Sequence, residues 1–260
     1  MRRRTVTAVS GMLVAAAATV FAIAGTGTAN AIANGELVPE GQYRFSVRLV
    51  MTGIPTATGG KRNSGCSGAL IAPQWIITAG HCFRDANGVR VQRPVADSTV
   101  ATIGRADTTG TGGYDLEVVA VRQSTTADVS VAKLASPVRG IKPLKISNSP
   151  PEPGDVLRLT GYGSVTGTNP VQETRLRTGQ LSVLNVEDST IGVEGFAPAD
   201  NTTPCPYDSG GPFFIEQRWR APQLVSVVSN GPSCPHTLEE TSARVDNLKD
   251  WIEDTIEATE

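Results

Sequence analysis

The chain has few residues suited to metal or nucleic-acid chemistry. Its 260 residues include only two histidines and four cysteines, and none of these shows the Cys-x-x-Cys or His-x-x-x-His spacing of a zinc site. A zinc site would have to combine Cys66, His81, Cys82 and His236, and their spacing argues against it. Basic residues form no run after residue 4, and the formal net charge is -2. We therefore expect neither a metal ion nor a nucleic-acid partner.

Long apolar runs are also few. The run from Gly11 to Ala24 is too short to span a bilayer. It follows three arginines at residues 2–4 and precedes Ala29-Asn30-Ala31, so residues 1–31 are predicted to be a signal peptide and not a membrane anchor. Cleavage after Ala31 leaves 260 − 31 = 229 residues with a net charge of (23 − 3) − 25 = -5. The export route, general or twin-arginine, stays open.

Turn-forming residues are abundant in the rest of the chain. Its 27 glycines and 17 prolines separate short runs of β-type alternation, which predicts an all-β protein. Residues 52–64 are predicted to be a surface loop, and residues 135–145 a link between two halves. Strands are predicted at residues 43–51, 66–71, 75–78, 99–103, 116–121, 129–134, 156–160, 180–186, 189–193, 213–215 and 224–229.

The last segment has a different periodicity. Leu248, Trp251, Ile252 and Ile256 recur at helical spacing, after Asp246 as a candidate cap. We expect a C-terminal helix whose apolar face packs on the body of the protein.

One stretch concentrates unusual chemistry. Asp208-Ser209-Gly210-Gly211 places two glycines directly after a serine, which permits a sharp turn that side chains would crowd. Such a turn can present a hydroxyl and neighbouring N–H groups to one point, as acyl transfer requires. A serine alone is a weak nucleophile, so a base is needed. His81, within Thr78-Ala79-Gly80-His81-Cys82, is the candidate.

These two stretches resemble the serine and histidine motifs of the chymotrypsin/trypsin-like serine peptidases. The usual forms in that family are Gly-Asp-Ser-Gly-Gly-Pro and Thr-Ala-Ala-His-Cys. Here both motifs occur in the family's order, and each lies beside a cysteine. The resemblance implies an all-β fold of two six-stranded antiparallel β-barrels with a C-terminal helix. Residues 32–145 would form the first barrel and residues 146–260 the second barrel with the helix, together one peptidase domain.

The resemblance also implies a catalytic triad. Ser209 would attack the scissile carbonyl, His81 would take and return the proton, and an acid would orient the imidazole. Asp128 is the candidate acid because it opens the segment Asp-Val-Ser-Val-Ala-Lys-Leu, similar to the family's Asp-Ile-Ala-Leu-Leu-Lys-Leu strand. Asp115 is its rival. This chemistry requires no metal and no organic cofactor.

Four cysteines in an exported chain fit two disulfides, with three possible pairings. The family pattern implies Cys66–Cys82, which would tie the histidine turn to its own hairpin. It also implies Cys205–Cys234, which would tie the serine loop to a neighbouring strand. Each bond would add about 3 kcal/mol, mostly by restricting the unfolded chain.

Cleavage after Ala31 would make Ile32 the first residue. Ile32-Ala33-Asn34-Gly35 resembles the Ile-Val-Gly-Gly start of mature trypsin-like enzymes. In that family the freed α-ammonium pairs with the Asp before the serine, here Asp208, and a buried pair of this kind is favourable only when both charges are present. Export alone would then activate the enzyme. The alternative is that Ile32 is a frayed terminus.

Tyr207 departs from the family pattern. The family has glycine there, and its backbone N–H receives the oxyanion together with that of Ser209. If the glycine serves a positive φ, a tyrosine is strained by about 1–3 kcal/mol. Alternatively the peptide flips and misdirects one donor, which costs about 10²–10³ in rate.

The substrate pocket departs as well. Ser229-Asn230-Gly231 matches the family's Ser-Trp-Gly, but Asn230 removes a large apolar wall. Thr203 stands where relatives that prefer Lys or Arg carry Asp, which argues against simple tryptic specificity. Glu240 aligns near the pocket base, where a buried carboxylate would attract a basic side chain. A solvated loop acid is the alternative for Glu240.

Together these features predict a secreted, monomeric serine endopeptidase that hydrolyses polypeptides through an acyl-enzyme. Its other expected partners are protein protease inhibitors, and no membrane contact is expected after signal cleavage. The alternative is a peptidase-like binding or toxin protein with weak turnover, which Tyr207 and Asn230 motivate.

Overall fold

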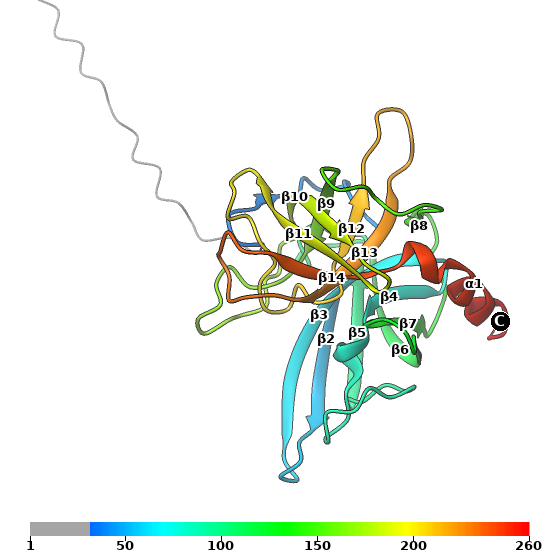
Figure 1. Cartoon of the computed structure of the whole chain (residues 1–260). Helices are drawn as coiled ribbons and strands as arrows, with labels where there is room; N and C mark the ends of the chain where they lie inside the picture. The colour runs from blue at the N-terminus through cyan, green and yellow to red at the C-terminus, as the bar shows by residue number, and fades with distance from the viewer. Residues whose placement is uncertain (1–31, 260) are drawn as a thin grey trace, which may run out of the picture.

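The first barrel is built from strands whose side chains alternate between its interior and its surface. In β2 (Ser46–Pro55) the alternate residues Val47, Leu49 and Met51 are buried. The computed structural model describes residues 32–259, and its first six long strands close in the order β2-β3-β4-β7-β6-β5, with β5 pairing back onto β2 (Figure 1). The other strands are β3 (Lys61–Ala72), β4 (Trp75–Ala79), β5 (Ser98–Ile103), β6 (Tyr114–Gln123) and β7 (Val129–Leu134).

The second barrel repeats this architecture. It closes in the order β9-β10-β11-β14-β13-β12 because β12 pairs back onto β9, and every pairing in the ring is antiparallel. Two short strands extend it, β1 (Glu36–Leu37) on β10 and β8 (Lys145–Ile146) on β13. The predicted fold of two six-stranded barrels with a C-terminal helix is confirmed. The ring consists of β9 (Val156–Gly161), β10 (Arg177–Val186), β11 (Thr190–Ala197), β12 (Pro212–Ile215), β13 (Gln223–Asn230) and β14 (Glu240–Arg244).

The prediction of a loop over residues 52–64 is wrong. Most of this segment continues β2 and β3 as a long hairpin, and only residues 56–60 lie outside the strands. Ile54 is buried and pairs with Arg62, while Gly53, with φ of +77°, lies in the irregular part of the pairing. The Gly, Thr and Pro content of the segment hid this one buried apolar side chain.

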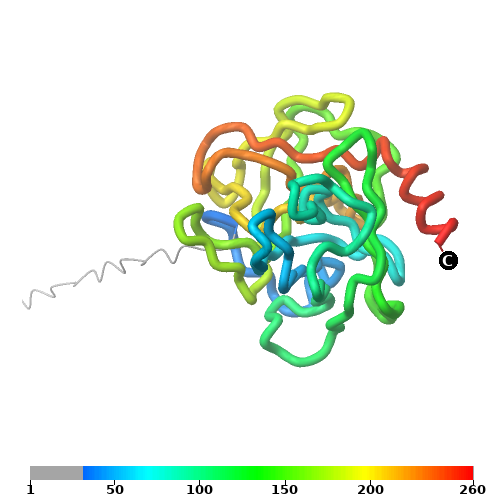
Figure 2. Tube along the Cα trace, turned by 90° about the horizontal axis from the view of Figure 1, so that it is seen from below, coloured from blue at the N-terminus to red at the C-terminus, as the bar shows by residue number. Residues whose placement is uncertain are grey.

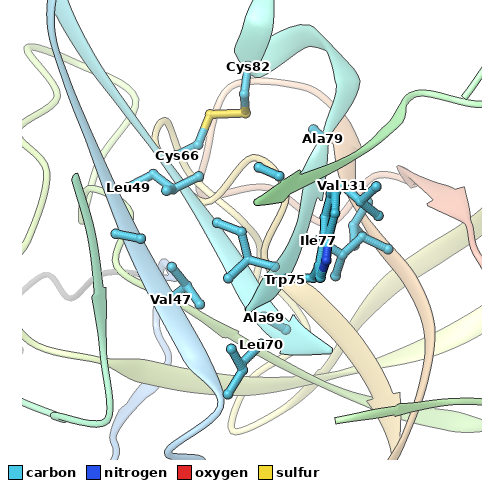
Figure 3. Packing of buried hydrophobic residues seen from close by; sticks show 14 of the residues in the cluster. Val47, Leu49, Cys66, Ala69, Leu70, Trp75, Ile77, Ala79, Cys82 and Val131 are labelled. Atoms are coloured by element: carbon cyan, nitrogen blue, oxygen red, sulfur yellow. A yellow bond between two sulfur atoms is a disulfide. The ribbon is translucent and has the colours of Figure 1, made fainter. Parts of the chain in front are cut away.

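The interior of the first barrel is apolar, and a disulfide closes one end of it. Ile77 on β4 and Val131 on β7 are direct cross-strand partners and are fully buried. Figure 3 shows both in the buried cluster that also contains the bond between Cys66 and Cys82. This bond ties β3 to η1 (Gly80–Phe83), the 3₁₀ turn that follows β4. The disulfide therefore holds the turn that carries the candidate base.

The two ends of the described chain lie on opposite sides of the molecule (Figures 1 and 2). At one end β1 joins the second barrel. At the other, α1 (Lys249–Glu257) buries Ile252 in the cluster that contains the first-barrel core. Asp246 does not cap this helix, because its carboxylate accepts two hydrogen bonds from Arg244, at 2.8 and 2.9 Å. Within residues 32–259, no helix is long and apolar enough to cross a membrane. The predicted signal peptide, residues 1–31, lies outside the described residues.

Candidate active site

A cleft of about 670 Å³ collects side chains from both barrels. His81 comes from η1, Asp128 directly precedes β7, and Ser209 lies in the loop before β12. Ser229, on β13, lines the same cleft. The fold thus brings together the three residues that the motifs single out, although they are far apart in the sequence.

Asp128 contacts His81 twice, once at the imidazole and once at the backbone. His81 Nδ1 lies 2.6 Å from Asp128 Oδ2, and the His81 backbone N–H donates to Oδ1 at 2.8 Å. Ser229 Oγ donates to Oδ2 at 2.8 Å. Burial alone would raise the pKa of Asp128, but the hydrogen bonds and charge of His81, with the bond from Ser229, hold it below its ordinary value. An ionised carboxylate therefore faces Nδ1 and leaves Nε2 as the basic nitrogen.

The rival acid, Asp115, lies outside this cleft. It is on β6, where it pairs with Arg105 and accepts a hydrogen bond from Thr102 Oγ1 at 2.7 Å. In the described part of the chain it forms no hydrogen bond or ion pair with His81, whereas Asp128 contacts the ring.

Close packing seats the Ser209 loop on the first barrel. Gly210 has φ of +81°, and a Cβ there would lie 2.0 Å from Thr78 Oγ1, so no larger residue fits. The Ser67 N–H donates to the Ser209 carbonyl at 2.9 Å. Among residues 32–259 the Ser209 hydroxyl has no hydrogen-bond partner. Bonds from a nucleophile to its base often tighten only when substrate binds.

Tyr207 has the backbone strain that its position predicts. Its φ is +75°, a region that disfavours bulky side chains. The preceding carbonyl, of Pro206, accepts a hydrogen bond from the Ser164 N–H at 2.7 Å, so the Tyr207 N–H of this trans peptide points the opposite way. Across the described residues, the N–H groups of Tyr207 and Ser209 have no hydrogen-bond partner. Both donors are available to a ligand oxygen.

Asp208, between these two donors, is completely buried. Its oxygens accept the N–H groups of Gly163 at 2.8 Å and Cys205 at 2.9 Å, and the backbone of Ile32 also hydrogen-bonds to it. Burial raises the pKa of Asp208 to about 7, although the N–H donors act to lower it. Ile32 is itself 0% exposed, so the alternative of a frayed terminus is wrong.

A pocket of about 280 Å³ adjoins Ser209 and includes Ser229, Asn230 and Gly231 in its wall. Glu240 also lines it and is 3% exposed, so the alternative of a solvated loop acid is wrong. A Cβ on Gly231 would lie 1.7 Å from Glu240 Oε2, which places the carboxyl group directly against this glycine. Burial, and then the charge on Asp208, raise the pKa of Glu240 to about 8.

Thr203 is a predicted pocket residue that the structure places elsewhere. It is completely buried, and its backbone pairs with that of Ala33 through hydrogen bonds in both directions. The wall of the pocket begins at the next residue, Pro204. The pairing with the N-terminal segment, which turns Thr203 away from the pocket, could not be seen in the sequence.

Conversely, His236, which the sequence suggested only as a zinc ligand, contacts the pocket residue Glu240. Its Nε2 lies 2.7 Å from Glu240 Oε1. The Leu238 N–H donates to Nδ1 at 3.1 Å, so Nδ1 is the acceptor and Nε2 carries the hydrogen. Burial also lowers the pKa of His236. A neutral imidazole therefore donates to Glu240, and the only sequence signal is their spacing of four residues.

Both disulfides implied by the family pattern are present, Cys66–Cys82 and Cys205–Cys234. The second ties the serine loop to the segment after β13. The zinc alternative is wrong because its two cysteines are bonded to each other and offer no thiolate.

The sequence is similar to those of known proteins. A family model described as Trypsin matches residues 32–252. The chain belongs to the trypsin family. Relatives include the thrombin-like enzyme acutin of Deinagkistrodon acutus, 28% identical over 208 residues that cover 74% of this chain and 85% of that protein. Snake venom serine protease KN14 of Trimeresurus stejnegeri is 25% identical over 231 residues, 83% of each chain. Serine protease 56 of Homo sapiens is 25% identical over 257 residues, 88% of this chain and 39% of that protein.

This trypsin-family chain is accordingly a serine endopeptidase, a hydrolase with polypeptide substrates. The family match covers both barrels and includes Ile32 at its start.

Replacing Tyr207 with glycine is expected to raise kcat. Glycine adopts a φ of +75° freely, whereas tyrosine is strained there by about 1–3 kcal/mol, and relief of this strain should keep the N–H aimed at the cleft. Tyr207→Ala removes the ring but keeps the strain, so it is the control and should give no increase. Steady-state kinetics would check this, and an unchanged or lower kcat in Tyr207→Gly would contradict it.

Proposed function

We propose that this trypsin-family endopeptidase is an exported enzyme that cleaves peptide bonds with Ser209, His81 and Asp128. The observation that carries the proposal is the 2.6 Å contact between His81 Nδ1 and Asp128 Oδ2 in the cleft that Ser209 also lines. A carboxylate in that position stabilises the imidazolium that forms when histidine accepts a proton.

The reaction would proceed in two halves. Ser209 Oγ attacks the scissile carbonyl carbon while its proton passes to His81 Nε2, and a tetrahedral oxyanion forms. The imidazolium, stabilised by Asp128, then gives the proton to the leaving amine as the C–N bond breaks, which leaves an acyl-enzyme ester. Water attacks this ester while His81 takes its proton, and the carboxylic acid product departs as the Ser209 hydroxyl is restored.

The oxyanion would be bound by the backbone N–H groups of Tyr207 and Ser209. Each such donor contributes about 10²–10³ to the rate. Their lack of other partners in the described residues supports this role. The strain at Tyr207, with Asn230 in place of the family's tryptophan, favours a binding protein with weak turnover instead, and the labelling experiment below separates the two.

Export and activation would be one event. Two disulfides are typical of proteins from oxidising compartments, which supports export. Ile32 is buried with its backbone against Asp208, so signal cleavage before it would release an α-ammonium beside a buried carboxylate. A cation there would offset the desolvation that raises the pKa of Asp208.

Glu240 would set specificity through its charge. His236 stays neutral, so the charge of the pocket follows Glu240 alone, whose pKa is about 8. Below that pH the carboxyl is protonated and the pocket favours an uncharged side chain. Above it the carboxylate attracts lysine or arginine.

A fluorophosphonate probe is expected to label the mature wild-type protein at Ser209, and Ser209→Ala should abolish labelling.

Asp128→Asn should lower kcat by about 10⁴ because the imidazolium loses its partner. The matched control is Asp115→Asn, which alters the rival acid and should leave kcat unchanged. Intact mass spectrometry and steady-state kinetics would measure both. A folded wild-type protein that is not labelled would support the binding-protein alternative.

The preference for arginine over citrulline, its uncharged isostere, is expected to rise as the pH increases through about 8. The physical reason is that the folded-state pKa of Glu240 is raised, so its charge appears only above that value. Comparing kcat/KM for two peptides that differ only in this residue, from pH 6 to pH 10, isolates the charge effect.

In Glu240→Gln the ratio of kcat/KM for the arginine peptide to that for the citrulline peptide should stay at its low-pH value from pH 6 to pH 10. Glu239→Gln, which alters the exposed neighbour, is the control and should retain the rise. A ratio independent of pH in the wild-type enzyme would contradict the role of Glu240.

A further inference from the structure

An arginine side chain also lies against Asp128. Arg90 Nη1 is 3.6 Å from Asp128 Oδ1, the oxygen that does not contact the imidazole ring. The guanidinium is anchored there, since Nη1 donates to the Ala127 carbonyl at 2.7 Å and Nη2 to the Ser124 carbonyl at 3.4 Å. A guanidinium is charged at every pH at which proteins fold. Asp128 thus sits between His81 and a permanent positive charge.

This position of Arg90 depends on a missing side chain at Gly80. The family's usual histidine motif has alanine at this point. A Cβ on Gly80 would lie 2.6 Å from Arg90 Nη1, 2.7 Å from Gln123 Oε1 and 3.0 Å from Asp128 Oδ1. Gly80 does not have a positive φ, so the glycine provides space and not an unusual conformation. Glycine in place of the family's alanine therefore leaves the room that Arg90 occupies beside Asp128.

We propose that Arg90 is a positioning residue that weakens the attraction between Asp128 and the His81 imidazolium, so that His81 stays available as a base in more acidic solution. The proposal rests on the catalytic roles assigned above. The charged side chains lining the cleft, within the described chain, are His81, Asp128, Arg84 and Arg90. Of the two arginines, Arg90 alone forms an ion pair with Asp128. Both members of this pair are about a quarter to a third exposed, so solvent reduces the effect without abolishing it.

The test is the pH dependence of kcat/KM for the full mature protein, measured with a substrate that is uncharged in the Glu240 pocket. In Arg90→Gln the acid limb should move to higher pH by about one unit, which lowers kcat/KM on that limb about tenfold. The plateau at higher pH should be unchanged or higher. Arg90→Lys keeps the charge and should retain most of the wild-type profile. Arg84→Gln, the control in the same cleft, should shift the limb by much less.

Gly80→Ala provides a second route, because its Cβ would crowd the Arg90 guanidinium beside Asp128, together with Gln123 Oε1. It should shift the acid limb in the same direction, and adding Arg90→Gln to it should cause no further shift. It also tests the proposal if Arg90→Gln does not fold.

An acid limb that stays in place in Arg90→Gln would overturn the proposal. A lower plateau of kcat/KM without a shift of the acid limb would overturn it as well, since Arg90 would then only stabilise the local structure. Absence of probe labelling in the wild-type protein would instead overturn the catalytic roles, and the proposal with them.

Discussion

A carboxylate without access to solvent links Ile32, the serine loop and the substrate pocket. Asp208 is completely buried, and the N–H groups around it come from Gly163, Cys205 and Ile32. The pKa of Asp208 in the folded protein is about 7, against an ordinary value of 3.8. The N–H donors therefore do not fully offset the cost of removing the carboxylate from water. A group with a raised folded-state pKa loses stabilising free energy as the pH rises from the unfolded to the folded value. Ionised Asp208 therefore needs a cation, and residue 32 is the place where cleavage would create one.

Several positions around the site require glycine because a side chain there would clash with a polar group, and not because the backbone has an unusual conformation. A Cβ on Gly163 would lie 2.3 Å from Asp208 Oδ2, and one on Gly231 would lie 1.7 Å from Glu240 Oε2. Gly80 leaves room in the same way beside Asp128. In each case the backbone lies so close to a carboxyl group that a Cβ would clash with it. The two buried acids of the site, Asp208 and Glu240, thus depend on neighbours that lack side chains.

The sequence predicts the fold and the residues that meet in the cleft well, because both have local signals. Ser209 and His81 stand in short motifs, Asp128 opens a recognisable strand, and the alternation of apolar residues marks most strands. The remaining features depend on contacts between distant segments. His236 meets Glu240 and Arg90 meets Asp128 without any motif, and Thr203 is turned from the pocket by the N-terminal segment. The carboxylate of Asp246 similarly binds Arg244 instead of capping the helix, a choice between two nearby partners that periodicity cannot show.

We propose that the α-ammonium of Ile32 pairs with Asp208 and thereby holds the serine loop. The most direct measurement is the rate of labelling of Ser209 by a fluorophosphonate probe in two mature proteins, one beginning at Ile32 and one with a single extra glycine before it. Labelling should be about 10²–10³ faster for the protein that begins at Ile32, the effect of one lost oxyanion donor. In an Asp208→Asn background the extra glycine should make no difference. Equal labelling rates for the two otherwise unaltered proteins would show that the ammonium does not hold the loop.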